Sequence, residues 1–217
     1  MTRRTNARIA GFTFLFYIAV AFPSMVLFKR ATSGAGTAAK LAGLAQHAAD
    51  VHLAVVLSLA GCCSALVLAV TLHAITREQD PDLAMLGLVF RVAEGVSGAV
   101  SIPATLGLLW LATATGANAP DPAAAQALGA YLLRPSPLEG AAFFAVGSLL
   151  FSWLLLRGRM IPVALAWLGV VASILVVIGL PLQLAGVLHD PVTSLMWLPM
   201  AAYEIPLGLW LLIKGVR

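Results

Sequence analysis

The sequence predicts an all-α protein, a polytopic membrane bundle of about six transmembrane helices that occupies residues 1–217 as a single domain. The first observation is composition, because 61% of the residues are hydrophobic and 10% are charged, whereas soluble domains average about 45–50% and about 25%. The second is length, because six apolar stretches can cross a hydrocarbon core of about 30 Å, which takes about 20 helical residues. Little of the chain remains for a soluble domain.

The six predicted spans lie near residues 9–28, 51–75, 83–114, 138–156, 161–188 and 193–213. Basic residues precede the first span, as they do in a secretory signal, but its apolar run is longer than the core of about 7–15 residues that signals have. The run also ends at Lys29 and not at a small-residue cleavage site. We therefore expect a retained first helix.

Two connections, near residues 37–50 and 122–133, carry apolar residues at helical spacing. In the first connection these residues are Leu41, Leu44, Ala48 and Val51, and in the second they are Leu128, Tyr131 and Leu132. Such spacing is typical of an amphipathic helix that lies in the headgroup region of a bilayer. We expect both connections to be interfacial segments on the outer side of the membrane.

The distribution of Lys and Arg predicts the orientation, because basic residues near helix ends favour the cytoplasmic side. With a cytoplasmic N-terminus, the residues facing the cytoplasm are Arg3, Arg4, Arg8, Arg77, Arg157, Arg159, Lys214 and Arg217. Those facing outward are Lys29, Arg30, Lys40 and Arg134. The bias predicts that both termini are cytoplasmic in a multi-pass protein of the cell (inner) membrane. The net charge of +4 indicates contacts with anionic membrane lipids, and the basic residues are too dispersed for a nucleic-acid partner.

The third predicted span carries two charged residues, Arg91 and Glu94. A charge at the centre of a membrane helix costs about 2.5–3.5 kcal/mol on insertion scales, so an intramembrane ionisable pair indicates a functional site by default. At about 100° per residue one arc of the helix collects the polar and small residues. These are Gly87, Arg91, Glu94, Ser97, Gly98 and Ser101. We expect Arg91 and Glu94, about one turn apart, to pair along the helix.

The last predicted span supplies a counterpart, Glu204, which lies near its middle beside Tyr203. A carboxylate at that depth needs a partner, and Arg91 is the natural one. Two interpretations stay open for this cluster. It is either a structural polar clamp between the third and sixth spans, or a clamp that also handles protons or binds a ligand.

The residues predicted to bind a ligand are Arg91, Glu94, Ser97, Ser101, Tyr203 and Glu204. The favoured function is a module that binds, senses or moves a lipid or an apolar or amphipathic small molecule, as a homo-oligomer or with a partner. One alternative is a membrane-embedded enzyme in which a protonated Glu204 or Glu94 acts on an isoprenoid or lipid. The sequence leans against an enzyme because it lacks the motifs of other membrane enzymes. The other alternative is a structural or accessory subunit.

No cofactor is expected, and most of the remaining acids have a structural explanation. Asp80-Pro81, Asp190-Pro191 and Ser136-Pro137 each place a capping side chain before a proline at the first helical position, and Glu139 completes a capping box with Ser136. A less favoured interpretation is a divalent metal site on the outer side. Its ligands would be His47, Asp50, His52, Glu139, His189 and Asp190. No tight pair such as HExxH is present, so the sequence favours the absence of a metal.

Three short motifs resemble the DUF4386 family of bacterial integral membrane proteins. They are the opening Arg8-Ile9-Ala10-Gly11-Phe12, the central Phe90-Arg91-Val92-Ala93-Glu94, and the closing segment that runs from Glu204-Ile205-Pro206 to Lys214-Gly215. The resemblance covers nearly the whole chain. It implies a bacterial membrane protein of the six-helix type, and it implies no activity.

Overall fold

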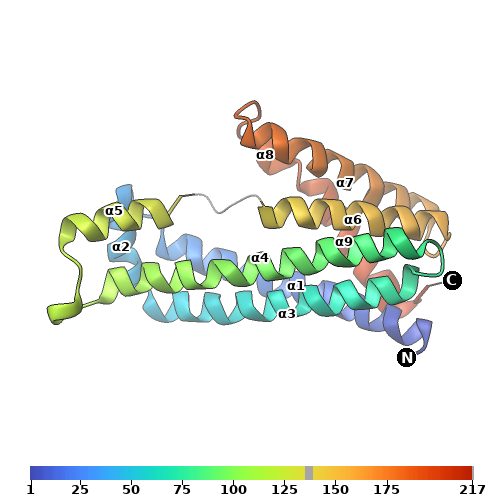
Figure 1. Ribbon diagram of the computed structural model, residues 1–217, viewed down its shortest axis with the longest axis horizontal. Coiled ribbons are helices and arrows are strands. Elements are labelled where there is room, and N and C mark those ends of the chain that lie inside the picture. The colour runs from blue at the N-terminus through green and yellow to red at the C-terminus, as the bar shows by residue number, and fades with distance from the viewer. Residues whose placement is uncertain (135–138, 217) are drawn as a thin grey trace. The chain divides into compact units, whose positions relative to one another are not determined.

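The computed structural model describes residues 1–134 and 139–216, except for the side chains of Asn118 and Glu139. Every regular element in these residues is a helix, which confirms the predicted fold class (Figure 1). In chain order they are α1 Arg3–Ala31, α2 Gly36–Gln46, α3 Ala48–Thr76, α4 Pro81–Thr113, the short 3-10 helix η1 Gly116–Asn118, α5 Pro122–Leu132, α6 Glu139–Arg157, α7 Val163–Leu184, α8 Val192–Leu195 and α9 Leu198–Ile213.

Six candidate membrane spans occur within the described residues: α1, α3, α4, α6, α7 and the combined segment α8–α9. Their most apolar windows have mean hydropathies from 1.4 to 2.7, and the shortest candidate is 18 residues long. At about 1.5 Å per residue, even that helix approaches the thickness of a hydrocarbon core. The chain is therefore a multi-pass membrane protein, as its composition predicts.

The helix ends differ from the predicted spans where polar or special residues intervene. The first helix covers Arg3–Ala31 and not 9–28, because charged residues are good helix formers and continue the helix beyond the apolar run. The fifth predicted span, 161–188, ends early at Leu184, because Gly186 adopts a positive φ of 71°. The amide of Val187 then donates to the carbonyl of Leu182 at 2.9 Å, which is a Schellman termination.

The predicted last span, 193–213, is divided into α8 and α9. Pro199 occupies the first turn of α9, where the missing amide hydrogen costs least, so the proline favours a new helix start at this point. A second proline, Pro206, lies inside α9 and leaves the carbonyl of Ala202 without its usual helical donor. Glu204 thus lies between two proline-dependent irregularities of α9.

Both predicted amphipathic connections are helical, as α2 and α5. Asp121 caps α5, since its carboxylate accepts the amides of Ala123 and Ala124 at 3.0 and 2.9 Å. The two helices pack against each other, because a Cβ added to Gly129 would lie 3.1 Å from Leu41 Cδ1. Their location at a membrane surface stays a prediction. The capping box predicted at residues 136–139 lies outside the described residues, apart from the start of α6 at Glu139.

The chain forms two compact units. Unit 1 contains Met1–Tyr17, Cys62–Ser97 and Leu138–Arg217, and unit 2 contains Ile18–Gly61 and Gly98–Pro137. Helices α1, α3 and α4 contribute residues to both units, and each unit has an apolar core of its own. In unit 1, α7 packs against α6 and α9. All the polar residues described in the next section as lining a cavity belong to unit 1.

One end of unit 1 collects the segments that the sequence predicts to be cytoplasmic. Arg3, at the start of α1, pairs with Glu78 in the α3–α4 turn at 3.8 Å. Asp80 in the same turn pairs with Arg157 at the end of α6 at 3.2 Å. The two ends of the chain also lie near each other here (Figure 1). The side of the membrane on which these segments lie stays a prediction.

Candidate functional site

Arg91 lies at the centre of unit 1 with 1% of its side chain exposed, which makes it one of the largest fully buried residues described. Its Nη1 atom lies 2.9 Å from Oε2 of Glu94, one helical turn further along α4. Glu94 is also buried. The pairing predicted from the spacing of these two residues is therefore present in the fold, and each charge reduces the cost of burying the other.

Three residues that the sequence did not single out surround this ion pair. The hydroxyl of Tyr17 on α1 donates to Oε1 of Glu94 at 3.2 Å. The ring of Phe144 on α6 lies 4.9 Å from the guanidinium carbon of Arg91, a favourable cation–π distance. Gly147, also on α6, provides the space, since a Cβ there would lie 2.9 Å from Cγ and Cδ of Arg91.

The guanidinium of Arg91 has more donors than the described residues satisfy. Its Nε, Nη1 and Nη2 atoms are buried and make no hydrogen bond within residues 1–134 and 139–216. The contact with Glu94 is short enough for an ion pair, but the N–H direction departs from hydrogen-bond geometry, so Oε2 of Glu94 is also buried without a hydrogen bond. Even if this acceptor took one N–H group of Arg91, further donors of the guanidinium would remain. A guanidinium carries five N–H donors, and each buried donor without an acceptor costs about 1–3 kcal/mol.

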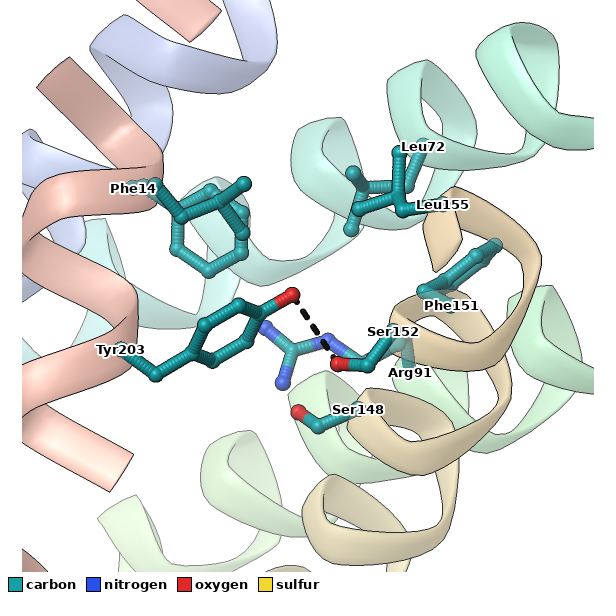
Figure 2. A pocket seen from close by; sticks show the side chains of 9 residues that line it. Phe14, Leu72, Arg91, Ser148, Phe151, Ser152, Leu155 and Tyr203 are labelled. Carbon is teal, nitrogen blue, oxygen red and sulfur yellow. Dashed lines mark hydrogen bonds between the residues drawn. The ribbon is translucent and has the colours of Figure 1, made fainter. Parts of the chain in front are cut away.

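A small cavity in unit 1 lies beside the guanidinium (Figure 2). Its polar lining consists of Arg91, Ser148, Ser152 and Tyr203, and its apolar lining consists of Phe14, Leu72, Phe151, Leu155 and Leu207. The cavity volume is about 10 Å³, which is close to the minimum needed for one water molecule. Figure 2 shows the guanidinium pointing between the ring of Tyr203 and the two serines. The cavity thus has room for about one water-sized polar atom.

The hydroxyls of the cavity add further donors. Ser152 on α6 donates to the phenolic oxygen of Tyr203 on α9 at 2.9 Å, which leaves the Tyr203 proton available for another acceptor. Ser148 lies four residues before Ser152 and hence on the same face of α6. Gly169 on α7 makes room for this group, because a Cβ there would lie 2.5 Å from Tyr203 Cε2 and 2.8 Å from Ser152 Oγ. The cavity is rich in donors and poor in acceptors.

Glu204 follows Tyr203 on α9 and is buried, with 8% of its surface exposed. It interacts electrostatically with both Arg91 and Glu94. Within the described residues it forms no hydrogen bond and no ion pair shorter than 4.0 Å, and it does not line the cavity. The three ionisable residues that the sequence singled out therefore form one electrostatic cluster, in which Glu204 makes no hydrogen bond or ion pair with the other two.

The sequence profile of the DUF4386 family, described as a domain of unknown function, matches residues 9–215. The chain belongs to the DUF4386 family. No curated protein and no solved structure matches it. The matched residues include the whole lining of the cavity and all three members of the electrostatic cluster. Membership confirms the resemblance seen in the sequence motifs, and together with the six apolar helices it establishes an integral membrane protein of unknown function.

Of the six residues predicted to bind a ligand in this DUF4386 protein, only Arg91 and Tyr203 line the cavity. Glu94 and Glu204 belong to the electrostatic cluster, whereas Ser97 and Ser101 belong to neither group. Ser97 lies six residues after Arg91, about 9 Å further along the helix axis, which is too far for one water-sized cavity to touch both. Its Cβ instead lies 3.6 Å from the position of a Cβ on Gly140. Ser101 is exposed, belongs to unit 2, and donates to the carbonyl of Gly98 at 2.6 Å.

No three His, Cys, Asp or Glu side chains lie close enough to share a metal ion in the part of the chain that is described. In unit 2, Asp50 pairs with His47 at 3.3 Å and with Arg30 at 4.0 Å, so its carboxylate is balanced by neighbouring side chains. His52 and His189 are exposed. The side chain of Glu139, another predicted ligand, lies outside the described residues.

The predicted structural roles of Asp80 and Asp190 differ in outcome. Asp80 caps α4, since its Oδ1 accepts the amide of Leu83 at 3.1 Å, as predicted. At Asp190 the structure differs from the prediction in detail, because α8 (Val192–Leu195) has Pro191 and not Asp190 as its N-cap residue. Oδ1 of Asp190 accepts the side-chain hydroxyls of Thr193 and Ser194. These two hydrogen bonds favour the ionised carboxylate and hold the pKa of Asp190 below its ordinary value.

A pH titration checks this interaction. A lowered pKa in the folded state contributes stability that is present above the pKa of the unfolded chain and is lost as the pH falls through the folded value. We expect the Thr193→Val substitution to raise the pKa of Asp190 towards the ordinary value of 3.8, as measured by carboxyl NMR shifts of the full chain. An unchanged pKa in Thr193→Val would contradict the assigned hydrogen bond.

Proposed function

We propose that this protein is a membrane-embedded module that binds the polar head of a small amphipathic molecule at Arg91. The proposal rests on one observation. The guanidinium of Arg91 is buried and faces a cavity, and its N–H groups find no acceptor among the described residues. A ligand oxygen at this position would satisfy donors that are otherwise costly to bury.

The chemistry of the cavity supports an amphipathic ligand. Arg91, Ser148 and Tyr203 direct donors into it, so the ligand must present a hydrogen-bond acceptor. The other walls are aliphatic and aromatic, which suits a hydrocarbon body. With a volume of about 10 Å³, the cavity admits about one ligand oxygen as the side chains stand, and the rest of the head needs the surrounding side chains to move. The body must displace Phe14, Leu207 or their neighbours to follow it.

The alternatives are less well supported by this geometry. An enzyme would need the proton-donating carboxylic acid next to its substrate, whereas neither Glu94 nor Glu204 lines the cavity. A clamp alone would be expected to pair its donors with its acceptors, and Oε2 of Glu94 offers too few acceptor sites for the three guanidinium nitrogens of Arg91. Ligand binding explains both the surplus donors and the cavity next to them.

We also propose the setting of the module. Both termini would face the cytoplasm from the cell (inner) membrane, since the basic ends of unit 1 lie together and favour that side. Apolar side chains such as Val89, Ile178 and Leu209 are exposed on the spans and would contact lipid tails. All nine residues that line the cavity belong to unit 1.

A binding measurement tests the proposed function. The full chain is placed in phosphatidylcholine nanodiscs and titrated with decanoate and with decanol, and partition into empty nanodiscs is subtracted. We expect saturable binding of at least one of the two probes. Ser148→Ala should raise the dissociation constant of decanoate about tenfold or more, because a hydrogen bond to a charged group contributes about 1.5–3 kcal/mol.

Ser173→Ala is the matched control. Ser173 is a buried serine of α7 in the same unit, its hydroxyl has no hydrogen-bond partner in the described residues, and it does not line the cavity. We expect it to bind both probes as the wild type does. Absence of saturable binding for both probes, or an equal loss in both serine variants, would show that the proposed site is not the binding site.

A further inference from the structure

The charges of the site limit what it can bind. Arg91 supplies one positive charge, and the two carboxylates that interact with it are those of Glu94 and Glu204. Like charges repel strongly where the dielectric constant is low. An anionic ligand at Arg91 would therefore bring a third negative group to a single cation.

No neighbouring helix supplies a second cation among the described residues. Tyr17 of α1 and Cys62 of α3 interact with Glu94, and Tyr203 of α9 interacts with Glu204 and Arg91. Helix α6 faces the cavity with serines, and α7 contains no titratable residue along its length. Any charge that a ligand brings must be balanced within the Arg91, Glu94 and Glu204 cluster itself.

The two glutamates are not equivalent proton acceptors. Glu94 contacts Arg91 directly and accepts a hydrogen bond from Tyr17, and both interactions favour its ionised form. Glu204 is buried without a direct partner in the described residues, so its negative charge has less compensation. A proton that enters the cluster to balance a bound anion therefore binds to Glu204.

The donors and the single cation of the site favour a carboxylate over other anions. A guanidinium offers N–H groups in one plane, which matches the planar carboxylate. A phosphate monoester carries a charge of about −1.5 to −2 and three acceptor oxygens, so a single cation balances it less well than it balances a carboxylate of charge −1. The hydroxyls of Ser148 and Tyr203 can donate further hydrogen bonds to the carboxylate oxygen that Arg91 binds.

We infer that the head bound at Arg91 is a carboxylate, and that it binds together with one proton that Glu204 takes up. The inference rests on the proposed function and narrows its ligand. The proton bonds to a carboxylate oxygen of Glu204, no other bond changes, and the net charge of the site is the same before and after binding. A carboxylate that passes through this site would thus travel with a proton as an electroneutral pair.

Calorimetry counts the proton directly. Decanoate is titrated into the full chain in phosphatidylcholine nanodiscs at one pH, in two buffers that differ in their ionisation enthalpy. We expect about one proton taken up per decanoate bound, and a dissociation constant that rises about tenfold per pH unit in the range where Glu204 is ionised. Decanol, which carries no charge, should bind more weakly and without proton uptake.

Two Glu→Gln variants separate the linkage from general damage. Glu204→Gln mimics the protonated acid, so decanoate should still bind, with no proton uptake and a flat pH dependence. Glu78→Gln is the matched control, because Glu78 is an exposed acid of the same unit that pairs with Arg3. It should keep the wild-type proton count, and the unfolding temperature of each variant verifies that it is folded.

The outcomes distinguish this inference from the proposed function. Decanoate binding without proton uptake, or decanol binding as tight as decanoate, would overturn the inference while leaving the proposed function standing. Failure of both probes to bind would overturn the proposed function itself. A titration with acetate tests whether the bound carboxylate belongs to an amphipathic molecule or to a small free acid. Binding of acetate as tight as that of decanoate would support the carboxylate and would replace the amphipathic ligand by a small free acid.

Discussion

Replacing Arg91 with Ala is expected to destabilise the protein by about 3–5 kcal/mol, which is the typical cost of removing one partner from a buried ion pair. The substitution leaves Glu94 and Glu204 buried with no cation among the described residues. It also removes the side chain that Gly147 and Phe144 accommodate. Reversible unfolding in mixed detergent micelles measures the loss, together with the yield of folded protein.

Arg157→Ala is the control for Arg91→Ala. Arg157 also pairs with an acid, Asp80, at 3.2 Å, but about half of its side chain is exposed. Exposed ion pairs contribute about 0–1 kcal/mol, so this substitution should be nearly neutral. If the two arginine variants unfold alike, the ion pair of Arg91 is not the buried structural element described above.

A double substitution separates the ion pair from the carboxylates it compensates. Adding Glu94→Gln to Arg91→Ala removes one of the two stranded charges, so part of the lost stability should return. Full recovery is not expected, because Glu204 still lacks a cation. The size of the recovery measures how much of the destabilisation comes from stranded charge and how much from lost packing.

The sequence predicts the membrane spans well because hydropathy is a local property of the chain. The apolar runs of α3 and α7 are long enough that no other structure satisfies their backbone groups in a bilayer. Helix ends are harder, because they depend on single residues. Gly186 ends α7 before its apolar residues run out, and Pro199 starts α9 within a continuous apolar stretch.

The candidate site is predicted only in part, and for a physical reason. Arg91, Glu94 and Glu204 are conspicuous in the sequence because charge is costly in a membrane. Tyr17 and Ser152 are not, because an isolated hydroxyl in an apolar helix commonly bonds to its own backbone and indicates no particular neighbour. The four-residue spacing of Ser148 and Ser152 is the one sequence signal for a polar face on α6.

For the glycines that shape the site, the sequence does not indicate which side chains they contact. Gly147 and Gly169 matter because Arg91 and Tyr203 fill the space where their side chains would be. Which side chain fills the space depends on how helices from distant parts of the sequence pack. In membranes, close approach through small residues replaces the hydrophobic drive, so such glycines decide which helices meet.

Gly11→Ala is expected to show this dependence most strongly, with a loss of stability of about 1–3 kcal/mol or more. Gly11 on α1 faces the backbone of α9. A Cβ there would overlap the amide nitrogen of Leu212 and would lie 2.6 Å from the carbonyl oxygen of Gly208. Backbone atoms cannot rotate away as a side chain does, so the two helices must separate. The unfolding midpoint in mixed micelles measures the effect.

The same substitution should also weaken decanoate binding, since the two helices carry walls of the cavity. Phe14 lies on α1 one turn after Gly11, and Tyr203 lies on α9. Gly107→Ala is the matched control, because the nearest atom to its Cβ would be Leu132 Cδ1 at 3.8 Å, an ordinary contact. It should leave binding unchanged and add up to about 1 kcal/mol of stability through helix propensity. Equal unfolding midpoints for the two glycine variants would contradict the close contact between α1 and α9, and with it the geometry that holds Tyr203 opposite Arg91.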